Sequence, residues 1–551
     1  MPTCRMDLEL VRRLVKTELS PELLDDLIFN LKGEIQSETG PEMEVEFTSD
    51  RPDIMCATGF ARAAKGYLGI EVGPVKYATR ETDFSVFVDT ESLASIRPFC
   101  DFAVVYGVNF DGASLKDILW YQEKLHSTLS SGRLKFAIGV HDVSNLVTHE
   151  LRYSAAEPSQ IRFTPLNSTK EMSGLEILSE TEKGREYSGL LSRMPKVPVF
   201  STADGTVLSM PPIINSELTH VTERTTTVLV DVTGNDQKLT EAVCAMMAHN
   251  LCELGGLLAY PRITDENGVR GRRKDREIVV SVRELNSVLG TSLSPEEAIA
   301  LLAKARIGAA RRGNGLRALV PPYRVDLLSA ADIFEEVAVF GGYQNLMPEL
   351  PRVPTRGGLH TSTKITAAAR RSLGSLGFVE YNGLLLGSLS DFSGVDSSFS
   401  AIEVSNPFSA ELNCLRPLLY PQILRLVFRN QNKPKPIRAF MVGPVSQVVD
   451  GGYVQSIHAA AAICDNIADA PTIEGYFTQF CRDLGLFPEL NNSQVEPLIS
   501  GRCAKVLVDG KEVGIIGEVK PKLLLEMRID YPVALFEVEI YRYKFDRYTL
   551  V

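Results

Sequence analysis

Four closely spaced acidic side chains are the first candidates for chemistry in this sequence. Asp326, Asp332, Glu335 and Glu336 lie in "PPYRVDLLSAADIFEEVAVFGGY", residues 321–343. Magnesium prefers hard oxygen ligands and keeps several of its waters, so one or two of these carboxylates would be enough to bind it. The functional interpretation of the cluster is therefore a Mg2+ site.

The local pattern predicts a helix that carries these acids. Ser329 can cap the helix, and Asp332 falls in its first turn. The expected inward stripe is Ile333, Val337 and Phe340, and the expected outward face is Asp332, Glu335 and Glu336. In the structural alternative, Asp332 accepts bonds from free amides at the helix N-terminus and the two glutamates are simply solvated.

A second candidate site lies on the predicted strand in "TTTVLVDVTGND". Side chains alternate along a strand, so Asp231 and Thr233 share one face, about 7 Å apart, while Val230 and Val232 point to the other. Asp231 is therefore expected on a face that does not belong to the core. The alternative is a solvent-facing acid near the end of a strand.

Most catalytic signatures are absent from the sequence. It has no P-loop, no G-x-G-x-x-G, no H-E-x-x-H and no G-x-S-x-G, so phosphate cradling, dinucleotide binding, zinc proteolysis and serine hydrolysis lose their simplest support. His141 in "AIGVHDV" could act as a general base at a strand end. A histidine beside an apolar strand is more often a hydrogen-bonded structural residue.

Composition is that of a multidomain globular protein. The chain has 551 residues, 44% of them hydrophobic and 23% charged, which suggests about three or four domains. Nine cysteines without a C-x-x-C pair favour reduced, buried thiols. The sequence contains no signal segment and no apolar run of about 18 residues, so we expect a cytoplasmic protein without a membrane partner. The net charge of −11 disfavours nucleic-acid binding over the whole surface but permits a local basic patch at 270–276, where a solvated loop is an equal alternative.

Four blocks are expected, all of them mixtures of helix and strand in an α+β multidomain chain. A mixed unit covers 1–80, a large α+β block covers 81–270, and the acid-bearing block covers 271–348. A proline-rich linker, "MPELPRVPTRGG", precedes the last block, 359–551. In that block Asp509-Gly510 predicts a hairpin turn.

Several of these stretches together resemble the β subunit of phenylalanyl-tRNA synthetase, archaeal and eukaryotic type. The N-terminal stretch is "DRPDIMCATGFARAAKGYLGI". Resemblance to the editing domain rests on "AIGVHDV", "VLSMPPIINSEL" and "LVDVTGND", and resemblance to a small helical metal-associated domain on "VPPYRVDLLSAADIFEEVAVFGGYQNLMPELP". "VSNPFSAELNCLRPLLYPQIL" and "GEVKPKLLLEMRIDYPVALFEVEI" resemble the antiparallel sheet of a class II catalytic-like domain. The match extends over nearly the whole chain and keeps the order of the family.

The resemblance implies a subunit of an α2β2 phenylalanine-tRNA ligase. In the family, ATP and phenylalanine are bound by the α subunit, which passes the amino acid to phenylalanine tRNA, so the activation site is expected outside this chain. The family's shared magnesium position, an acid followed by acids six, nine and ten places on, falls on the four acids at 326, 332, 335 and 336.

The last block departs from the family at several positions. Met441 and Pro444 stand where acids are usual, Lys520 replaces a usual histidine, and Pro417 replaces a small hydroxyl residue. These differences agree with a class II sheet that has lost its chemistry, and they leave the subunit packing open.

The resemblance also implies hydrolysis of tyrosine wrongly attached to phenylalanine tRNA. A pocket for phenylalanine rejects tyrosine only weakly, so a second, hydrolytic site is needed. Asp231 is the expected acceptor for the phenolic hydroxyl, with Thr233 beside it, and Asn215 and Glu217 are candidates for holding the attacking water. The alternatives are a free-standing tRNA-editing hydrolase and a pure scaffold; Asp231 buried in an ion pair would favour the scaffold.

Overall fold

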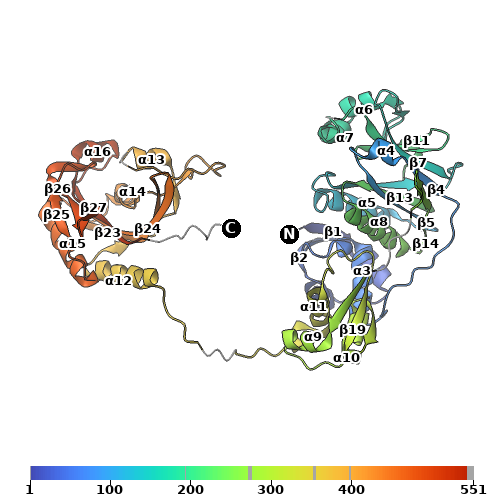
Figure 1. Ribbon diagram of the computed structural model, residues 1–551, viewed down its shortest axis with the longest axis horizontal. Helices are drawn as coiled ribbons and strands as arrows, with labels where there is room; N and C mark the ends of the chain where they lie inside the picture. Colours follow the sequence, from blue (N-terminus) through green and yellow to red (C-terminus); the bar gives the residue numbers. More distant parts are fainter. Residues whose placement is uncertain (1, 193, 271–275, 351–354, 396–398, 543–551) are drawn as a thin grey trace. The chain divides into compact units, whose positions relative to one another are not determined.

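The chain forms two compact units, Met1–Leu350 and Pro351–Val551 (Figure 1). The computed structural model describes residues 2–192, 194–270, 276–350, 355–395 and 399–542. The first unit contains the first three expected blocks, and each block contributes sheets of its own. The mixed α/β character predicted from the sequence is confirmed.

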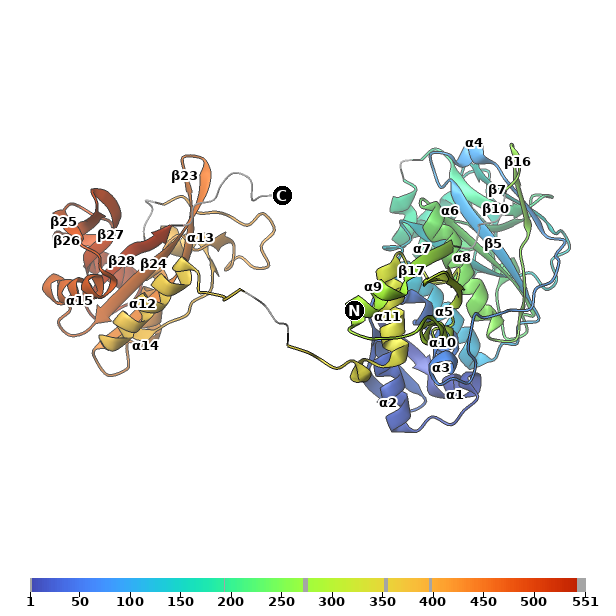
Figure 2. The same cartoon turned by 60° about the horizontal axis from the view of Figure 1, so that its bottom comes forward.

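The N-terminal block is a three-stranded sheet with three helices. Its strand order is β1-β3-β2, antiparallel throughout. The elements are β1 (Thr3–Asp7), α1 (Leu8–Val15), α2 (Pro21–Asn30), β2 (Gly33–Thr39), β3 (Glu42–Phe47) and α3 (Ala57–Tyr67). Figures 1 and 2 both show α3 beside α11 (Ala330–Gly341) of the third block, and the ring centroids of Tyr67 and Phe340 are 5.8 Å apart.

The second block is built on a four-stranded antiparallel sheet, in the order β14-β5-β13-β6. Its strands are β5 (Phe99–Tyr106), β6 (Phe136–Asp142), β13 (Thr227–Gly234) and β14 (Leu257–Ala259). Helices α5 (Gly112–Ser127) and α8 (Gln237–Cys252) pack on one face, where Val228, Val230 and Val232 are fully buried. The alternation read from the sequence is thus correct for the valine face.

A seven-stranded mixed sheet covers the opposite face, in the order β12-β11-β10-β7-β4-β15-β16. A buried cluster that includes Phe102, Leu229, Tyr153 and Phe200 joins the two sheets. The strands are β4 (Ser85–Val88), β7 (Glu150–Ala156), β10 (Val197–Thr202), β11 (Val207–Met210), β12 (Ile214–Asn215), β15 (Arg262–Asp265) and β16 (Gly268–Val269). The smaller elements are α4 (Thr90–Leu93), β8 (Arg162–Phe163), β9 (Met172–Ser173), α6 (Gly174–Glu180) and α7 (Glu182–Tyr187).

The third block, where the family resemblance implied a small helical domain, combines helices with a three-stranded antiparallel sheet. The sheet has the order β17-β19-β18, with β17 (Arg276–Ser281), β18 (Gly308–Arg312) and β19 (Gly315–Val320). Its helices are α9 (Val282–Leu289), α10 (Pro295–Lys304) and α11. β18, "GAARR", has no β-branched or aromatic residue, so its composition does not predict a strand.

Close packing holds the third block against the first. A side-chain carbon at Gly66 of α3 would lie 2.2 Å from the carbonyl oxygen of Lys304, so only glycine allows this approach. Arg62 on the same helix is buried, donates to Asn250 Oδ1 of α8 at 2.7 Å, and lies 4.1 Å from the Tyr323 ring. The three blocks are therefore joined through α3.

The second unit is a seven-stranded sheet, antiparallel except for its β20–β23 pair, in the order β20-β23-β24-β28-β27-β26-β25. Its strands are β20 (Val379–Glu380), β23 (Ile437–Val449), β24 (Gly452–Cys464), β25 (Glu489–Asn492), β26 (Leu498–Val508), β27 (Lys511–Val519) and β28 (Val533–Arg542). Its helices are α12 (Thr361–Ser375), α13 (Leu389–Ser393), α14 (Tyr420–Asn430), α15 (Ala470–Leu484) and α16 (Pro521–Glu526), and β21 (Leu386–Gly387) pairs with β22 (Cys414–Leu415).

The two faces of this sheet are covered by different helices. α12 and α15 pack on one face and α14 on the other. The predicted turn at Asp509-Gly510 joins β26 to β27, as expected. Over the described parts of both units, no helix is long and apolar enough to span a bilayer.

Candidate functional site

Asp231 lies in the middle of β13, between Phe102 of β5 and Gly139 of β6. It is 2% exposed, and its Oδ1 lies 3.0 Å from Nε2 of His141. The expectation that this face lies outside the core is wrong, because the seven-stranded sheet covers it. Asp231 is therefore a buried, hydrogen-bonded acid, which is the arrangement that favours the scaffold alternative.

His141 is the partner that the sequence did not assign to Asp231. It is fully buried on β6, and its Nδ1 lies 2.8 Å from Oγ1 of Thr219. Its ring centroid is 6.0 Å from that of Phe200, which stacks on Phe102. A hydroxyl, an imidazole and a carboxylate thus form a continuous chain inside an otherwise apolar layer.

Thr233 shares the face of Asp231, as predicted, but it is engaged by an arginine. Arg97 Nε donates to Thr233 Oγ1 at 3.1 Å, and Arg97 Nη2 donates to the Thr233 carbonyl oxygen at 3.0 Å. Burial lowers the pKa of Arg97 to about 10. Thr233 therefore anchors Arg97 by these two hydrogen bonds, while Asp231 is bonded to His141.

The two candidates for holding water differ in position. Asn215, half-buried at the end of β12, donates from Nδ2 to the Val140 carbonyl at 3.3 Å, one residue from His141. Glu217 is also half-buried, accepts from the Asn167 amide at 2.7 Å, and lies 3.0 Å from His220 Nδ1. The hydrogen bond from His220 lowers the pKa of Glu217. Of the two candidates, only Asn215 bonds to the strand that carries His141.

Two of the four clustered acids are held by one arginine. Arg324 Nε and Nη2 donate to the two oxygens of Asp326 at 2.8 and 2.6 Å, and Nη1 donates to Glu336 at 3.0 Å. Glu336 is 2% exposed, so its placement on the outward face of the helix was wrong. Burial raises the pKa of Glu336, but the charges of Arg324 and Arg51 outweigh it and hold that pKa below its ordinary value.

The other two acids have separate partners. Asp332 Oδ2 accepts from the amides of Leu328 and Ser329 at 2.8 and 2.6 Å, as the structural alternative predicted. Glu335 is exposed and forms a 2.8 Å ion pair with Lys32. The predicted inward stripe is confirmed, since Ile333, Val337 and Phe340 are all buried.

This arrangement does not fit a Mg2+ ion shared by the four carboxylates. Across the described residues, no three His, Cys, Asp or Glu side chains are grouped so that they could hold a metal. The positive charge that a carboxylate cluster requires is supplied by Arg324 and Lys32. The basic patch at 270–276 cannot be compared in the same way, because 271–275 lie outside the described residues.

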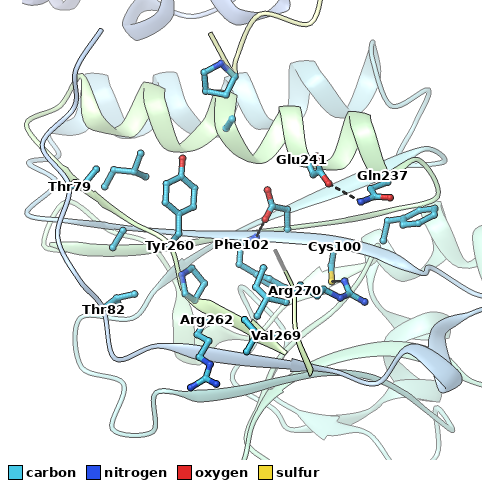
Figure 3. Close-up of a pocket in the computed structure, with 18 of the residues that line it drawn as sticks. Thr79, Thr82, Cys100, Phe102, Gln237, Glu241, Tyr260, Arg262, Val269 and Arg270 are labelled. Carbon is cyan, nitrogen blue, oxygen red and sulfur yellow. Dashed lines mark hydrogen bonds between the residues drawn. The ribbon is translucent and has the colours of Figure 1, made fainter. Parts of the chain in front are cut away.

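A large cavity of about 1610 Å³ lies at the edge of β5 that β14 leaves unpaired (Figure 3). Cys100 and Phe102 of β5, Gln237 and Glu241 of α8, and Arg270 contribute to its wall. Gln237 donates to Glu241 at 3.0 Å, and Arg270 is held by Asp265. The predicted editing residues are absent from its lining, so this cavity is separate from the hydrogen-bonded series Thr219–His141–Asp231.

The helix α14 side of the second unit's sheet is closed by structural contacts. Glu537 accepts from the amides of Leu419 and Tyr420 at the start of α14 and lies 2.7 Å from His458 Nδ1. Met441, which stands where the resembling family has an acid, is buried beneath the helix. Apolar and helix-capping side chains thus take the place of charged ligands on this face.

Comparison with known proteins identifies the family. A phenylalanine–tRNA ligase beta subunit from Sulfurisphaera tokodaii is 33% identical over 540 residues, covering 96% of this chain and 97% of that protein. The chain belongs to the phenylalanine–tRNA ligase β-subunit family. A beta subunit from Archaeoglobus fulgidus is 35% identical over 508 residues, covering 90% of this chain and 91% of that protein. The resemblance seen in the sequence is confirmed.

Two regions each match a tRNA synthetase domain family. Residues 278–343 match the tRNA synthetase B5 domain, and residues 346–540 match the phenylalanyl tRNA synthetase beta chain CLM domain. A crystal structure of an N-terminal fragment of the phenylalanyl-tRNA synthetase β-subunit from Pyrococcus horikoshii superposes with a TM-score of 0.59 at 32% identity, covering 62% of this chain and all of that fragment. As a β-subunit family member, the chain is a component of an aminoacyl-tRNA ligase.

Sequence reasoning missed the partners that define the site. His141 and Thr219 are 90 and 12 residues from Asp231 in the chain, so no local spacing links them. Arg324 stands only two residues before Asp326, and that proximity was the available sign that the acid cluster has an internal cation.

Proposed function

We propose that this chain is the β subunit of an α2β2 phenylalanine–tRNA ligase. The α subunit would bind ATP and phenylalanine and activate the amino acid, while this chain completes the assembly and contributes to binding phenylalanine tRNA. Family membership over nearly the whole chain supports this role. The closed α14 side of the second unit's sheet supports an activation site outside the chain.

We further propose that the chain hydrolyses tyrosine wrongly attached to phenylalanine tRNA. The observation that carries this proposal is a buried carboxylate, Asp231, set among the rings of Phe102 and Phe200. A tyrosine hydroxyl would donate a charge-assisted bond to it, whereas phenylalanine would leave a desolvated acceptor unpaired at a cost of about 1–3 kcal/mol. A site of this kind discriminates by the hydroxyl alone.

Hydrolysis requires no protein nucleophile, because the aminoacyl ester is already activated. A water held by polar groups near the ester can attack its carbonyl carbon. Hydrogen-bond donors at the site must then stabilise the oxyanion that develops. Asn215 is the better placed of the two candidates, since it lies next to β6. Glu217 would have to leave His220 to take part.

A scaffold subunit without hydrolytic activity is the second candidate function. The buried pair of His141 and Asp231 favours it, because a carboxylate already satisfied inside the protein has less to gain from a ligand. The two functions differ in one measurable property, the release of tyrosine from mischarged tRNA.

The test is Asp231→Ala in the assembled enzyme. We expect tyrosine release from tyrosyl-tRNA to fall by about 100-fold or more, because the discriminating acceptor is lost. Charging of tRNA with phenylalanine should survive and serves as the control for folding and assembly. A parent enzyme that releases no tyrosine would establish the scaffold function, and undiminished release by the variant would remove Asp231 from the site.

A further inference from the structure

We infer that Thr219, His141 and Gly139 position the Asp231 carboxylate, so that one oxygen is held by the protein and the other is presented to the hydroxyl of a tyrosyl ester. The inference rests on the proposed hydrolysis and names what sets its specificity. Thr219, His141 and Gly139 are positioning residues, because they act through Asp231.

Hydrogen-bond geometry fixes the direction of the chain. A carboxylate only accepts, so Nε2 of His141 carries the proton that points to Asp231. With that proton on Nε2, Nδ1 is the ring nitrogen left to accept from Thr219 Oγ1 at 2.8 Å. The other acceptor within reach of that hydroxyl, the Ser216 carbonyl, is 3.4 Å away and forms the weaker bond. Asp231 therefore sets the tautomer of His141, and the Thr219 hydroxyl supports it by donating to Nδ1.

His141 bonds to Oδ1 of Asp231, which leaves the other carboxylate oxygen, Oδ2, without a bond from this series of residues. The described residues donate no hydrogen bond to Oδ2 of Asp231. Nor is Oδ2 among the fully buried side-chain oxygens and nitrogens that lack a hydrogen-bond partner. A hydroxyl reaching Asp231 would find one carboxylate oxygen committed and one available. The buried pair is thus compatible with a ligand, provided that His141 keeps its orientation.

Gly139 leaves the room that this arrangement needs. It pairs with Asp231 across the sheet, and a side-chain carbon at this position would lie 1.7 Å from Asp231 Oδ1 and 2.7 Å from His141 Nε2. Any other residue would drive the carboxylate and the imidazole apart. Gly139→Ala therefore disturbs the pair without removing a polar group.

The experiment compares tyrosine and phenylalanine release from charged phenylalanine tRNA in the assembled enzyme. Thr219→Val removes the hydroxyl at nearly constant shape, and Thr219→Ser restores it. We expect Thr219→Val to lower the ratio of tyrosine release to phenylalanine release about tenfold, the equivalent of about 1.4 kcal/mol, and Thr219→Ser to stay within about twofold of the parent. Gly139→Ala should lower the ratio at least as much as Thr219→Val.

The release ratio separates positioning from general destabilisation, which would reduce charging and the thermal midpoint together. Retention of the parent ratio in Thr219→Val and Gly139→Ala, alongside its loss in Asp231→Ala, would overturn the inference and leave the proposed hydrolysis intact. Equal loss in the Val and Ser variants would also overturn it, since the hydroxyl would then not matter. Undiminished tyrosine release by Asp231→Ala would overturn both.

Discussion

At the scale of single residues, Asp117 of α5 is a buried acid outside the candidate site. Its Oδ1 accepts from the Ala57 amide at 2.8 Å and its Oδ2 from the Thr58 amide at 3.3 Å, at the start of α3. Burial raises its pKa to about 6, because these bonds only partly offset the loss of water. Because Asp117 binds the N-terminus of α3, the helix that contacts all three blocks, its titration should make the stability of the first unit pH-dependent.

The sign of that dependence follows from the raised pKa. The folded protein binds the proton of Asp117 more tightly than the unfolded chain, so the stability from this group is fully present below about pH 4 and is lost as the pH rises through about 6. Asp117→Asn should remove about 2–3 kcal/mol of this change. Urea unfolding of parent and variant at pH 4 to 7 measures it, with exposed Asp450→Asn as the matched control. Parallel stability curves for parent and Asp117→Asn would contradict the assignment.

Residue patterns predicted which side chains share a face but not what covers that face. Alternation along β13 correctly placed Asp231 with Thr233 and away from Val230 and Val232. Whether a strand face meets solvent or another sheet depends on distant chain segments, here β7 and β10, which lie roughly 30 to 80 residues before Asp231. The burial of Asp231 and its bond to His141 are therefore tertiary facts that a single strand does not encode.

At the scale of elements, α11 shows both the reach and the limit of helical periodicity. The N-terminal capping role of Asp332 and the apolar stripe follow from local spacing, and both are present. Glu336 lies one residue before buried Val337 on the helix, and its burial depends on an arginine from the preceding loop. A charge on the edge of an apolar stripe can be drawn inward whenever a partner of opposite sign is buried with it.

Removing one member of this buried group should be costly. Glu336→Gln leaves Arg324, which is 1% exposed at its side chain, with Asp326 as its remaining carboxylate. We expect a loss of about 3 kcal/mol in the free energy of unfolding, because an incompletely paired buried charge is expensive. The control is Glu335→Gln, because Glu335 is exposed and its partner Lys32 keeps Asp50, so this pair should contribute less than about 1 kcal/mol.

The same variants test the magnesium interpretation by thermal unfolding. Arg324 and Lys32 neutralise three of the four acids, and Asp332 is held by backbone amides. The unfolding midpoint of the parent should therefore respond to MgCl2 no more than to NaCl of equal ionic strength. A midpoint that rises specifically with Mg2+ in the parent, and not in Glu336→Gln, would return the cluster to a metal-binding role.

At the scale of the whole molecule, order along the chain was the most informative signal. No single stretch identified the family, but segments from residue 50 to residue 540 occurred together in the family's order, and the relatives cover nearly all of the chain. The division into two units after Leu350 falls within the proline-rich linker, 347–358, that was predicted from the sequence. In the third block, β18 and β19 were missed because they are short and contain alanine, glycine and arginine in place of a run of β-branched residues, whereas β17, "REIVVS", has the composition of a strand.

The second unit determines what the chain can do alone. Activation of an amino acid requires charged groups that hold the polyphosphate of ATP, yet the α14 side of its sheet buries Met441 and commits Glu537 to the start of α14. Arg416, buried beside this face, donates to the carbonyl oxygens of Pro444 and Gly383 at 2.8 and 3.2 Å. The polar groups of this surface are used to hold the fold together.

The purified chain should therefore show no phenylalanine-dependent exchange of pyrophosphate into ATP. Exchange should appear only when the α subunit is added. It should be unchanged when the β chain carries Asp231→Ala, because Asp231 belongs to the first unit and the catalytic-like sheet to the second. The measurement is exchange of labelled pyrophosphate with and without phenylalanine, with the α subunit alone as a further control. Robust exchange by the isolated chain would mean that the chain has an activation site of its own and would contradict the proposal.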